Sequence, residues 1–302
     1  MLNFMSQIEQ TSAILFFIDG LGIGRDCADN PLSQISGIEP LAHFVDRPSN
    51  VIYGGLIKPT DPRLGIEGRP QSASGQTTIL TGINTPRQLG YHKQGFPNQA
   101  MREIIAEHSI FRQLKKGKIE PNVFVNTYTP QFFTERPRWK SATTCAVEAA
   151  GMRFRRLPDL LGREAIFHDF TNQWLRERGF NVPLFTASEA AEILFRQSQK
   201  FRFVLYEHFI TDKIGHAQDF AAARLHLPRL AEMIRETLRG IDLEKTTFIL
   251  TSDHGNIEDL SVRNHTLNDV PTIIWGRKKE EFAESIKDLS DITPAILQLL
   301  SQ

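Results

Sequence analysis

The stretch AILFFIDGLG, residues 13–22, carries much of the information about the fold. It begins with a continuous apolar run over residues 13–18, and Asp19 and Gly20 follow directly. A continuous run, unlike an alternating one, is typical of a strand that is buried on both faces of a parallel sheet. The run is also too short to span a bilayer. We therefore predict a central strand here, with a carboxylate at its carboxyl end.

Further apolar runs have the same character and alternate along the chain with helical patterns. The runs are Asn122–Tyr128, Phe203–Tyr206, Thr246–Leu250 and Val270–Trp275, and the helical patterns are Asn98–Lys116, Ser188–Gln197, Leu225–Gly240 and Asp291–Leu300. Ser188 and Asp291 are candidate helix N-caps. This alternation predicts an α/β fold with a doubly wound, mainly parallel sheet flanked by helices.

The length of 302 residues fits one large domain, residues 1–302, with a modest insertion. Residues 131–185 have weak strand signals and are rich in aromatic residues and in arginine, at Arg136, Arg138, Arg153, Arg155, Arg156 and Arg163. We predict a small, mainly helical insertion there. An ordinary solvated helical face would explain the arginines equally well.

The charge balance gives no reason to propose nucleic acid or a membrane surface as a partner, because 35 basic residues match 35 acidic ones. The two cysteines, Cys27 and Cys145, form no Cys-x-x-Cys motif, and this favours a reducing compartment over a disulfide framework. The first residues lack the basic start of a signal peptide, so we expect a cytoplasmic protein. The sequence does not indicate an oligomeric state.

Carboxylates and imidazoles gather where three predicted strands end. The runs lead into Asp19, Asp212 and Asp253, and parallel strands bring their carboxyl ends to one edge of the sheet. Three carboxylates at one edge repel one another unless a cation lies between them. The imidazoles of His216, His254 and His265 follow nearby. Each histidine alone is more often a structural hydrogen-bonding group, but the joint pattern predicts divalent metal binding.

The segment QSASGQTTILTG, residues 71–82, predicts a loop that opens into a short apolar helix. Backbone N–H groups and the helix dipole favour a phosphate at such a position. A serine beside a cation can ionise and act as a nucleophile. Ser72 is the preferred nucleophile and Ser74 is its rival, whereas a serine-rich N-cap without chemistry is the alternative.

These motifs resemble those of the alkaline phosphatase superfamily of metalloenzymes, and most of all its branch of cofactor-independent phosphoglycerate mutase and phosphopentomutase. The resemblance rests on Asp19-Gly20-Leu21-Gly22, Ser72-x-x-Gly75, Asp212-x-x-Gly215-His216, Asp253-His254-Gly255-Asn256 and His265-Thr266-x-Asn268-x-Val270-Pro271. It implies a phosphoserine intermediate at Ser72 and two divalent metal ions. One ion would be held by Asp212, His216 and His265, and the other by Asp19, Asp253, His254 and the Ser72 oxygen. Mixed imidazole and carboxylate ligands suit Zn²⁺ or Mn²⁺, and Mg²⁺ less well.

The chain departs from that branch in three respects. The mutases have histidine where this chain has Gln76, and they carry a large cap domain for which there is no room here. Their substrate-binding Arg-Asp motif has no clear counterpart, the nearest string being Gly162-Arg163-Glu164. Since a mutase must shield its phosphoenzyme from water, the short insertion favours hydrolysis of a small phosphate ester. Arg87 and Lys93, in the loop after the nucleophile helix, are candidate substrate-binding residues.

Other functions compete with this hypothesis. A phosphomutase or a phosphodiesterase could use the same site, whereas a sulfatase is disfavoured because neither cysteine lies in a Cys-x-Pro-x-Arg context. A catalytically silent metal-binding protein is the alternative from another class. A dinucleotide site at residues 20–24 is weaker, because the glycine spacing is Gly-x-Gly-x-Gly and the acidic residue precedes the loop.

Overall fold

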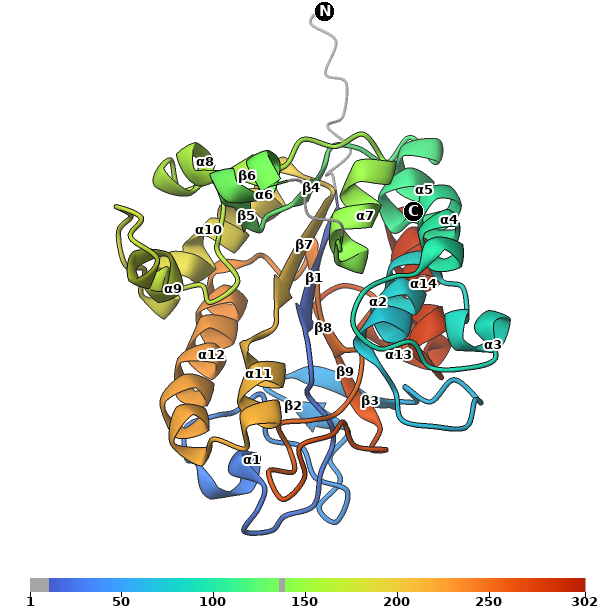
Figure 1. The fold of residues 1–302 in the computed structure, drawn as a ribbon, viewed down its shortest axis with the longest axis vertical. Coiled ribbons are helices and arrows are strands. Elements are labelled where there is room, and N and C mark those ends of the chain that lie inside the picture. The colour runs from blue at the N-terminus through green and yellow to red at the C-terminus, as the bar shows by residue number, and fades with distance from the viewer. Residues whose placement is uncertain (1–10, 136–138, 302) are drawn as a thin grey trace, which may run out of the picture.

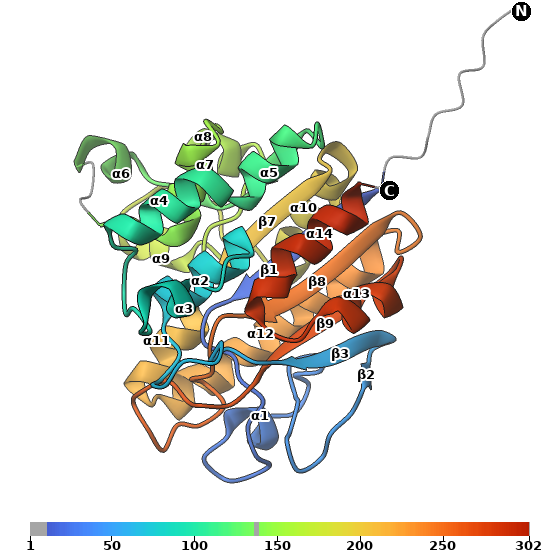
Figure 2. The ribbon, with the colours of Figure 1, turned by 90° about the vertical axis from the view of Figure 1, so that its right-hand side faces the viewer.

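The computed structural model describes residues 11–135 and 139–301, and its centre is one seven-stranded sheet. The strand order is β2-β3-β9-β8-β1-β7-β4, and Figure 2 shows it from β2 to β7. In chain order these strands are β1 (Ser12–Ile18), β2 (Val51–Ile52), β3 (Gly55–Thr60), β4 (Asn122–Phe124), β7 (Phe203–His208), β8 (Thr246–Ser252) and β9 (Val270–Trp275). The short strands β5 (Thr127–Tyr128) and β6 (Arg155–Arg156) pair separately.

The predicted α/β class and mainly parallel sheet are confirmed, with one correction at the sheet edge. β4, β7, β1 and β8 are parallel, with β1 between β7 and β8. β9, expected as a parallel strand, instead runs antiparallel to both β8 and β3. The reason is the connection, because the chain from Asp253 to Asp269 forms no crossover helix, and parallel neighbours need one.

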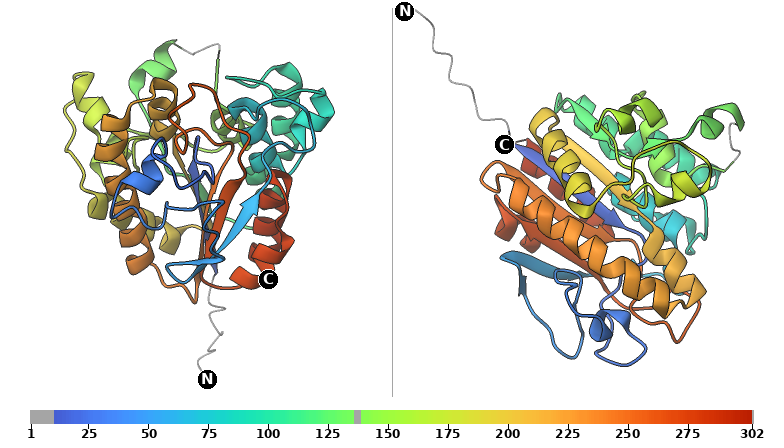
Figure 3. Two further views of the ribbon diagram at one scale, coloured as in Figure 1. Left: turned by 90° about the horizontal axis from the view of Figure 1, so that it is seen from below. Right: turned by 90° about the vertical axis from the view of Figure 1, so that its left-hand side faces the viewer.

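Helices cover both faces of the sheet, as Figure 1 shows. Alternate residues of β1 separate two cores: Ile14 and Phe16 face one, and Leu15 and Phe17 face the other. The first core is covered by α1 (Pro31–Gln34), α10 (Ala187–Lys200) and α12 (Phe220–Gly240), which is the long orange helix in Figure 3. The second is covered by α2 (Ser72–Thr81), α4 (Gln99–His108), α5 (Ile110–Lys116), α7 (Ala142–Ala149), α13 (Lys279–Ser285) and α14 (Ile292–Leu300).

Several predicted boundaries shift for local reasons. The helix expected over residues 98–116 breaks at Ser109, which is extended and caps α5 by accepting a hydrogen bond from the backbone N–H of Arg112. α10 starts earlier than predicted, because Thr186 and Glu189 form a reciprocal capping box and Ser188 does not cap. Asp291 precedes α14, but its carboxylate accepts hydrogen bonds from the backbone N–H groups of Lys287 and Asp288. Its side chain therefore does not cap that helix.

The predicted insertion, residues 131–185, is mostly short helices and loops. Its helices are α6 (Pro130–Glu135), α7, α8 (Leu157–Leu161) and α9 (Gln173–Glu177). Arg136 and Arg138 lie outside the described residues. The strand predicted over residues 122–128 divides here, because β4 ends at Phe124 and β5 pairs with β6 of this segment. Whether it is a separate insertion stays a prediction.

The remaining helices are α3 (Thr85–Leu89), α11 (Ile210–Ala217) and the 3₁₀ turn η1 (Leu289–Asp291). Within the described part of the chain, every helix is too short or too polar to cross a membrane.

Candidate active site

The three predicted aspartates come together at the carboxyl edge of the sheet. Asp19 follows β1 and Asp253 follows β8. Asp212 was expected at a strand end, but β7 ends at His208 and Asp212 lies in the first turn of α11. The helix places Asp212 and His216 one turn apart on the same face. Their side chains can therefore approach the same point, as the sequence analysis required of this segment.

One group, which we call cluster A, contains Asp19, Asp253 and His254, all buried. Nε2 of His254 lies 3.2 Å from Oδ1 of Asp19 and 3.6 Å from Oδ2 of Asp253. The Ser72 hydroxyl oxygen is 2.9 Å from the same nitrogen. Residues from three distant parts of the chain thus meet around one point.

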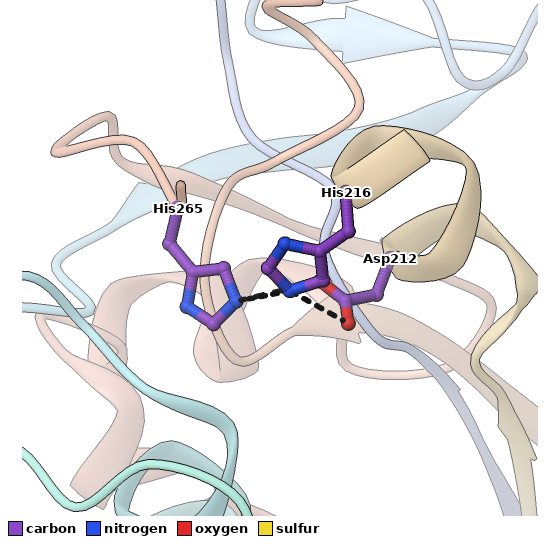
Figure 4. A group of neighbouring side chains, drawn as sticks. All are labelled: Asp212, His216 and His265. Carbon is purple, nitrogen blue, oxygen red and sulfur yellow. Dashed lines mark hydrogen bonds and ion pairs between the residues drawn. The ribbon is translucent and has the colours of Figure 1, made fainter. Parts of the chain in front are cut away.

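The second group, cluster B, contains Asp212, His216 and His265, whose side chains converge in Figure 4. Nε2 of His216 lies 3.4 Å from Asp212 Oδ2, and Nε2 of His265 lies 3.5 Å from Asp212 Oδ1. The His265 ring also stacks on the ring of His254, with 3.6 Å between centroids. Clusters A and B are therefore adjacent.

The side chains of both clusters fit a divalent metal ion. In each histidine Nδ1 faces a backbone carbonyl oxygen, 2.8 Å away at Pro70 for His265, 2.7 Å at Arg263 for His216 and 3.3 Å at Gly255 for His254. A proton on Nδ1 leaves Nε2 as a lone-pair donor aimed at the carboxylates. Nε2 of His216 and Nε2 of His265 are only 3.1 Å apart, and Oδ1 of Asp19 is buried without a hydrogen-bond partner. Converging lone pairs of this kind need a cation between them.

The pKa values of the side chains in both clusters also favour a cation at this site. Burial, and then the charge of Asp253, raises the pKa of Asp19 to about 7, and burial raises that of Asp253 to about 6. Burial lowers the pKa of His254, but the charges of Asp253 and Asp19 outweigh it and raise that pKa to about 10. Burial also opposes ionisation of Asp212, yet hydrogen bonding to His265 holds its pKa well below the usual range. The carboxylates thus demand positive charge beside them.

Comparison with known proteins agrees with this geometry. The family model described as the Metalloenzyme superfamily matches residues 180–302. This carboxyl-terminal part of the chain is therefore similar to the alkaline phosphatase-like metalloenzyme superfamily. Over 110 residues it is 29% identical to the 2,3-bisphosphoglycerate-independent phosphoglycerate mutase of Ehrlichia canis, which is 34% of this chain but only 22% of that mutase.

Two solved structures show how far the fold extends. The PH0037 protein of Pyrococcus horikoshii superposes with a TM-score of 0.57 at 15% identity, over 97% of each chain. A cold-active alkaline phosphatase from the psychrophile Shewanella sp. gives a TM-score of 0.53 at 12% identity, over 96% of this chain and 99% of the phosphatase. Similarity of the fold to these structures thus spans nearly the whole chain.

Ser72 and Ser74 differ in their surroundings within this superfamily fold. Ser72 is the first residue of α2, is partly exposed and faces His254. Ser74 is fully buried, donates to the carbonyl oxygen of Gln71 and accepts from the N–H of Lys93. The spacing to Gly75 has a steric cause, because a Cβ there would lie 2.9 Å from the carbonyl oxygen of Asp253. Glycine lets α2 approach cluster A closely enough for Ser72 to reach it.

Gln76, the residue that replaces the mutases' histidine, holds two carboxylates. Its amide Nε2 lies 3.0 Å from Asp19 Oδ2 and 3.2 Å from Asp253 Oδ2. An amide has two N–H groups, so it can donate to both at once. The sequence analysis noted that Gln76 departs from the mutase motif, but nothing in the sequence indicated that its side chain bridges Asp19 and Asp253.

Glu258 was missed by sequence reasoning and connects several motifs of the superfamily. Its Oε2 accepts from the N–H groups of Gly22 at 2.9 Å and Asn256 at 2.7 Å. Its Oε1 accepts from the hydroxyl of Thr266 at 2.5 Å and the amide of Asn268 at 3.0 Å. This buried carboxylate therefore fastens the loop after β1 to the loops that carry His254 and His265.

A cleft of about 490 Å³ opens beside the clusters. Asp19, Ser72 and Asp212 line it, and the other described residues that line it include Lys140, Arg178, Lys213 and several aromatic side chains. Arg87 is exposed on α3, and Lys93 donates to the carbonyl oxygen of Gln94; neither lines the cleft. Their substrate-binding role stays a prediction, and sequence reasoning did not single out Lys140, Arg178 or Lys213.

A larger hollow of about 850 Å³ lies between α5 and α14 and is lined by residues such as Glu107, Arg112 and Lys116. The candidate metal-binding groups of the described residues are clusters A and B, and neither borders this hollow. The smaller cleft is therefore the candidate active site.

Proposed function

We propose that this protein transfers a phosphoryl group from a small phosphate ester to water, through a phosphoserine at Ser72. The observation that carries the proposal is the position of the Ser72 hydroxyl, 2.9 Å from Nε2 of His254, in a residue that lines the cleft. The first turn of α2 supplies an N-terminal environment that favours a phosphate. Ser74 is less suited, because its hydroxyl is buried and engaged at both its donor and its acceptor site.

Two divalent ions, Zn²⁺ or Mn²⁺ rather than Mg²⁺, complete the proposed site. Asp212, His216 and His265 would hold one, and Asp19, Asp253, His254 and the Ser72 oxygen the other. Such ions neutralise phosphate charge and favour the ionised form of a bound hydroxyl. Gln76 fixes the orientation of the Asp19 and Asp253 carboxylates, and the backbone carbonyls at the three Nδ1 atoms fix the rings.

Water is the favoured acceptor because the cleft is open to solvent. Residues along it, including Phe96, Trp139 and Lys213, are exposed. A mutase has to keep water away from its phosphoenzyme until the second hydroxyl arrives. Phosphoglycerate mutase activity is the second candidate, since the curated relatives bear that name, although the matched part covers about a fifth of their length.

The test is to load the protein with Zn²⁺ or Mn²⁺ and measure phosphate release from an aryl phosphate. Rapid acid quenching followed by peptide mass spectrometry should find a phosphoserine at Ser72. Ser72→Ala should abolish turnover and the phosphopeptide while keeping most of the bound metal, whereas Ser74→Ala should keep the phosphopeptide.

Three results would overturn parts of the proposal. Near-normal turnover in Ser72→Ala with loss in Ser74→Ala would move the nucleophile. Conversion of 3-phosphoglycerate to its 2-phospho isomer without phosphate release would establish a mutase. Bound metal without any phosphoenzyme would favour the silent metal-binding alternative.

A further inference from the structure

Several aromatic side chains line the cleft beyond the metal clusters. Trp174 of α9 and Phe209, just before α11, are half-buried, and their ring centroids lie 5.9 Å apart. Nearer the solvent, Phe96 and Trp139 stack at 6.5 Å with an interplanar angle of 25°. These two rings stay 46% and 55% exposed, which is unusual for residues of this size. The cleft therefore offers ring faces and edges to whatever enters it.

Cations lie among these rings. The Nζ atom of Lys213 sits 4.3 Å from the centroid of Trp174, and the Arg178 guanidinium is 5.8 Å from the same centroid. Within the described residues, neither side chain forms an ion pair with a carboxylate. Lys140 differs, because its Nζ lies 2.7 Å from Glu148 Oε1. Lys213 and Arg178 thus leave positive charge available to an anionic substrate that approaches Ser72.

We propose that the cleft selects phosphate monoesters whose alcohol part carries an aromatic or heteroaromatic ring. This inference rests on the proposed function, because it assigns a substrate class to the same site. A polyhydroxylated substrate would need carboxylates and amides to receive its hydroxyl groups. Beyond the metal clusters the cleft is lined by one of each, and both are engaged: Glu207 accepts from the Thr143 hydroxyl, and the Gln76 amide donates to Asp19 and Asp253. Rings, by contrast, pack on rings through their faces and edges. With the phosphoryl group at Ser72, the alcohol part extends toward Trp174 and Phe209, and the rim pair of Phe96 and Trp139 can cover a larger ring.

The first experiment compares two esters with the metal-loaded wild-type protein. 2-Naphthylmethyl phosphate and ethyl phosphate both release a primary alcohol, so their intrinsic reactivities are similar. Because stacking on one aromatic side chain changes binding about 10-fold, we expect kcat/KM to be at least about 10-fold higher for the naphthyl ester. Equal values, or a preference for ethyl phosphate or for 3-phosphoglycerate, would overturn the inference.

A variant series then assigns the preference to the cleft. Trp174→Ala should lower kcat/KM about 10-fold for the naphthyl ester but less than about 3-fold for ethyl phosphate, and Trp174→Phe should restore most of the difference. Tyr53→Ala is the matched control, because Tyr53 is 55% exposed on the turn between β2 and β3 and does not line the cleft. An equal loss for both esters in Trp174→Ala would contradict the proposed contact.

Binding of phosphonates separates this inference from the proposed reaction. 2-Naphthylmethylphosphonate and ethylphosphonate cannot be hydrolysed, so titration calorimetry reports recognition alone. We expect the naphthyl compound to bind at least about 10-fold more tightly, with the excess lost in Trp174→Ala. Tight naphthyl binding without turnover of any ester would refute the proposed function and keep the substrate class. Equal binding, or none, would refute the substrate class whether or not esters are hydrolysed.

Discussion

Replacing Glu258 by glutamine should destabilise the fold and weaken both metal clusters, although Glu258 belongs to neither. The carboxylate is 1% exposed and accepts four hydrogen bonds, two on each oxygen. Glutamine can present only one carbonyl oxygen, and its NH₂ group then faces two donors. Two hydrogen bonds are lost as a result, and the donors that made them stay buried.

The magnitude follows from the kind of hydrogen bond. A hydrogen bond to a charged group contributes about 1.5–3 kcal/mol, so two of them amount to roughly 3–6 kcal/mol. Removing a buried charge offsets part of this loss. We therefore expect the free energy of unfolding of Glu258→Gln to fall by about 3 kcal/mol. Metal affinity should fall about 10- to 100-fold, as is usual when a residue that positions metal ligands is lost.

The assay is urea unfolding of the metal-free protein, followed by tryptophan fluorescence, and titration of Zn²⁺ against a competing chelator. Glu232→Gln is the matched control, because it makes the same chemical change on the exposed face of α12. It should stay within about 0.5 kcal/mol of wild type. If both variants unfold alike and bind Zn²⁺ alike, Glu258 does not hold the loops together as argued.

Three further perturbations test other parts of the structure. Gln76→Ala removes the bridge between the Asp19 and Asp253 carboxylates. The value of kcat/KM for an aryl phosphate should therefore fall about 10- to 100-fold, whereas Ser72→Ala should abolish activity. Unchanged kinetics in Gln76→Ala would show that the bridge is dispensable. His216→Ala should reduce bound metal from two ions to one by elemental analysis, whereas His108→Ala, at a histidine outside both clusters, should keep both. Burial lowers the pKa of His43 from 6.5 to about 4, so its neutral form favours the folded state fully above pH 6.5, and this stabilisation is lost as the pH falls toward 4. His43→Phe should therefore remove about 2 kcal/mol of the stability loss seen between pH 7.5 and pH 5 in urea unfolding, and an unchanged pH dependence would contradict the burial argument.

The sequence predicted best what short stretches encode by themselves. β1 with Asp19 and β8 with Asp253 are apolar runs that end in a carboxylate, so the strand and the carboxylate are visible together in the sequence. Asp212 and His216 were expected to lie close together, and their side chains come within 3.4 Å, although the position of Asp212 on a helix was not foreseen. The apolar pattern continues past His208 through Phe209 and Ile210, and nothing in it marks the change from strand to helix.

Features that depend on distant partners could not be predicted. The direction of β9 is set by its pairing with β8 and β3, and an apolar run has no direction of its own. Glu258 has no local signal, since its carboxylate meets Gly22 across 236 positions of the chain. The bridge from Gln76 to Asp19 and Asp253 is of the same kind.

The proposed site divides into a part that would carry out the phosphoryl chemistry and a part that would contact the substrate, and different segments of the chain supply the two parts. Residues 180–302, which match the superfamily, carry cluster B, most of cluster A and Glu258. The rings of Phe96, Trp139 and Trp174 all lie outside that segment. The similarity to phosphoglycerate mutases over residues 180–302 therefore bears on the proposed metal binding and phosphoryl transfer. It carries no information about the cleft walls that Phe96, Trp139 and Trp174 form. The alcohol that the enzyme accepts has to be inferred from those walls, and their aromatic faces favour a ring over a glycerate.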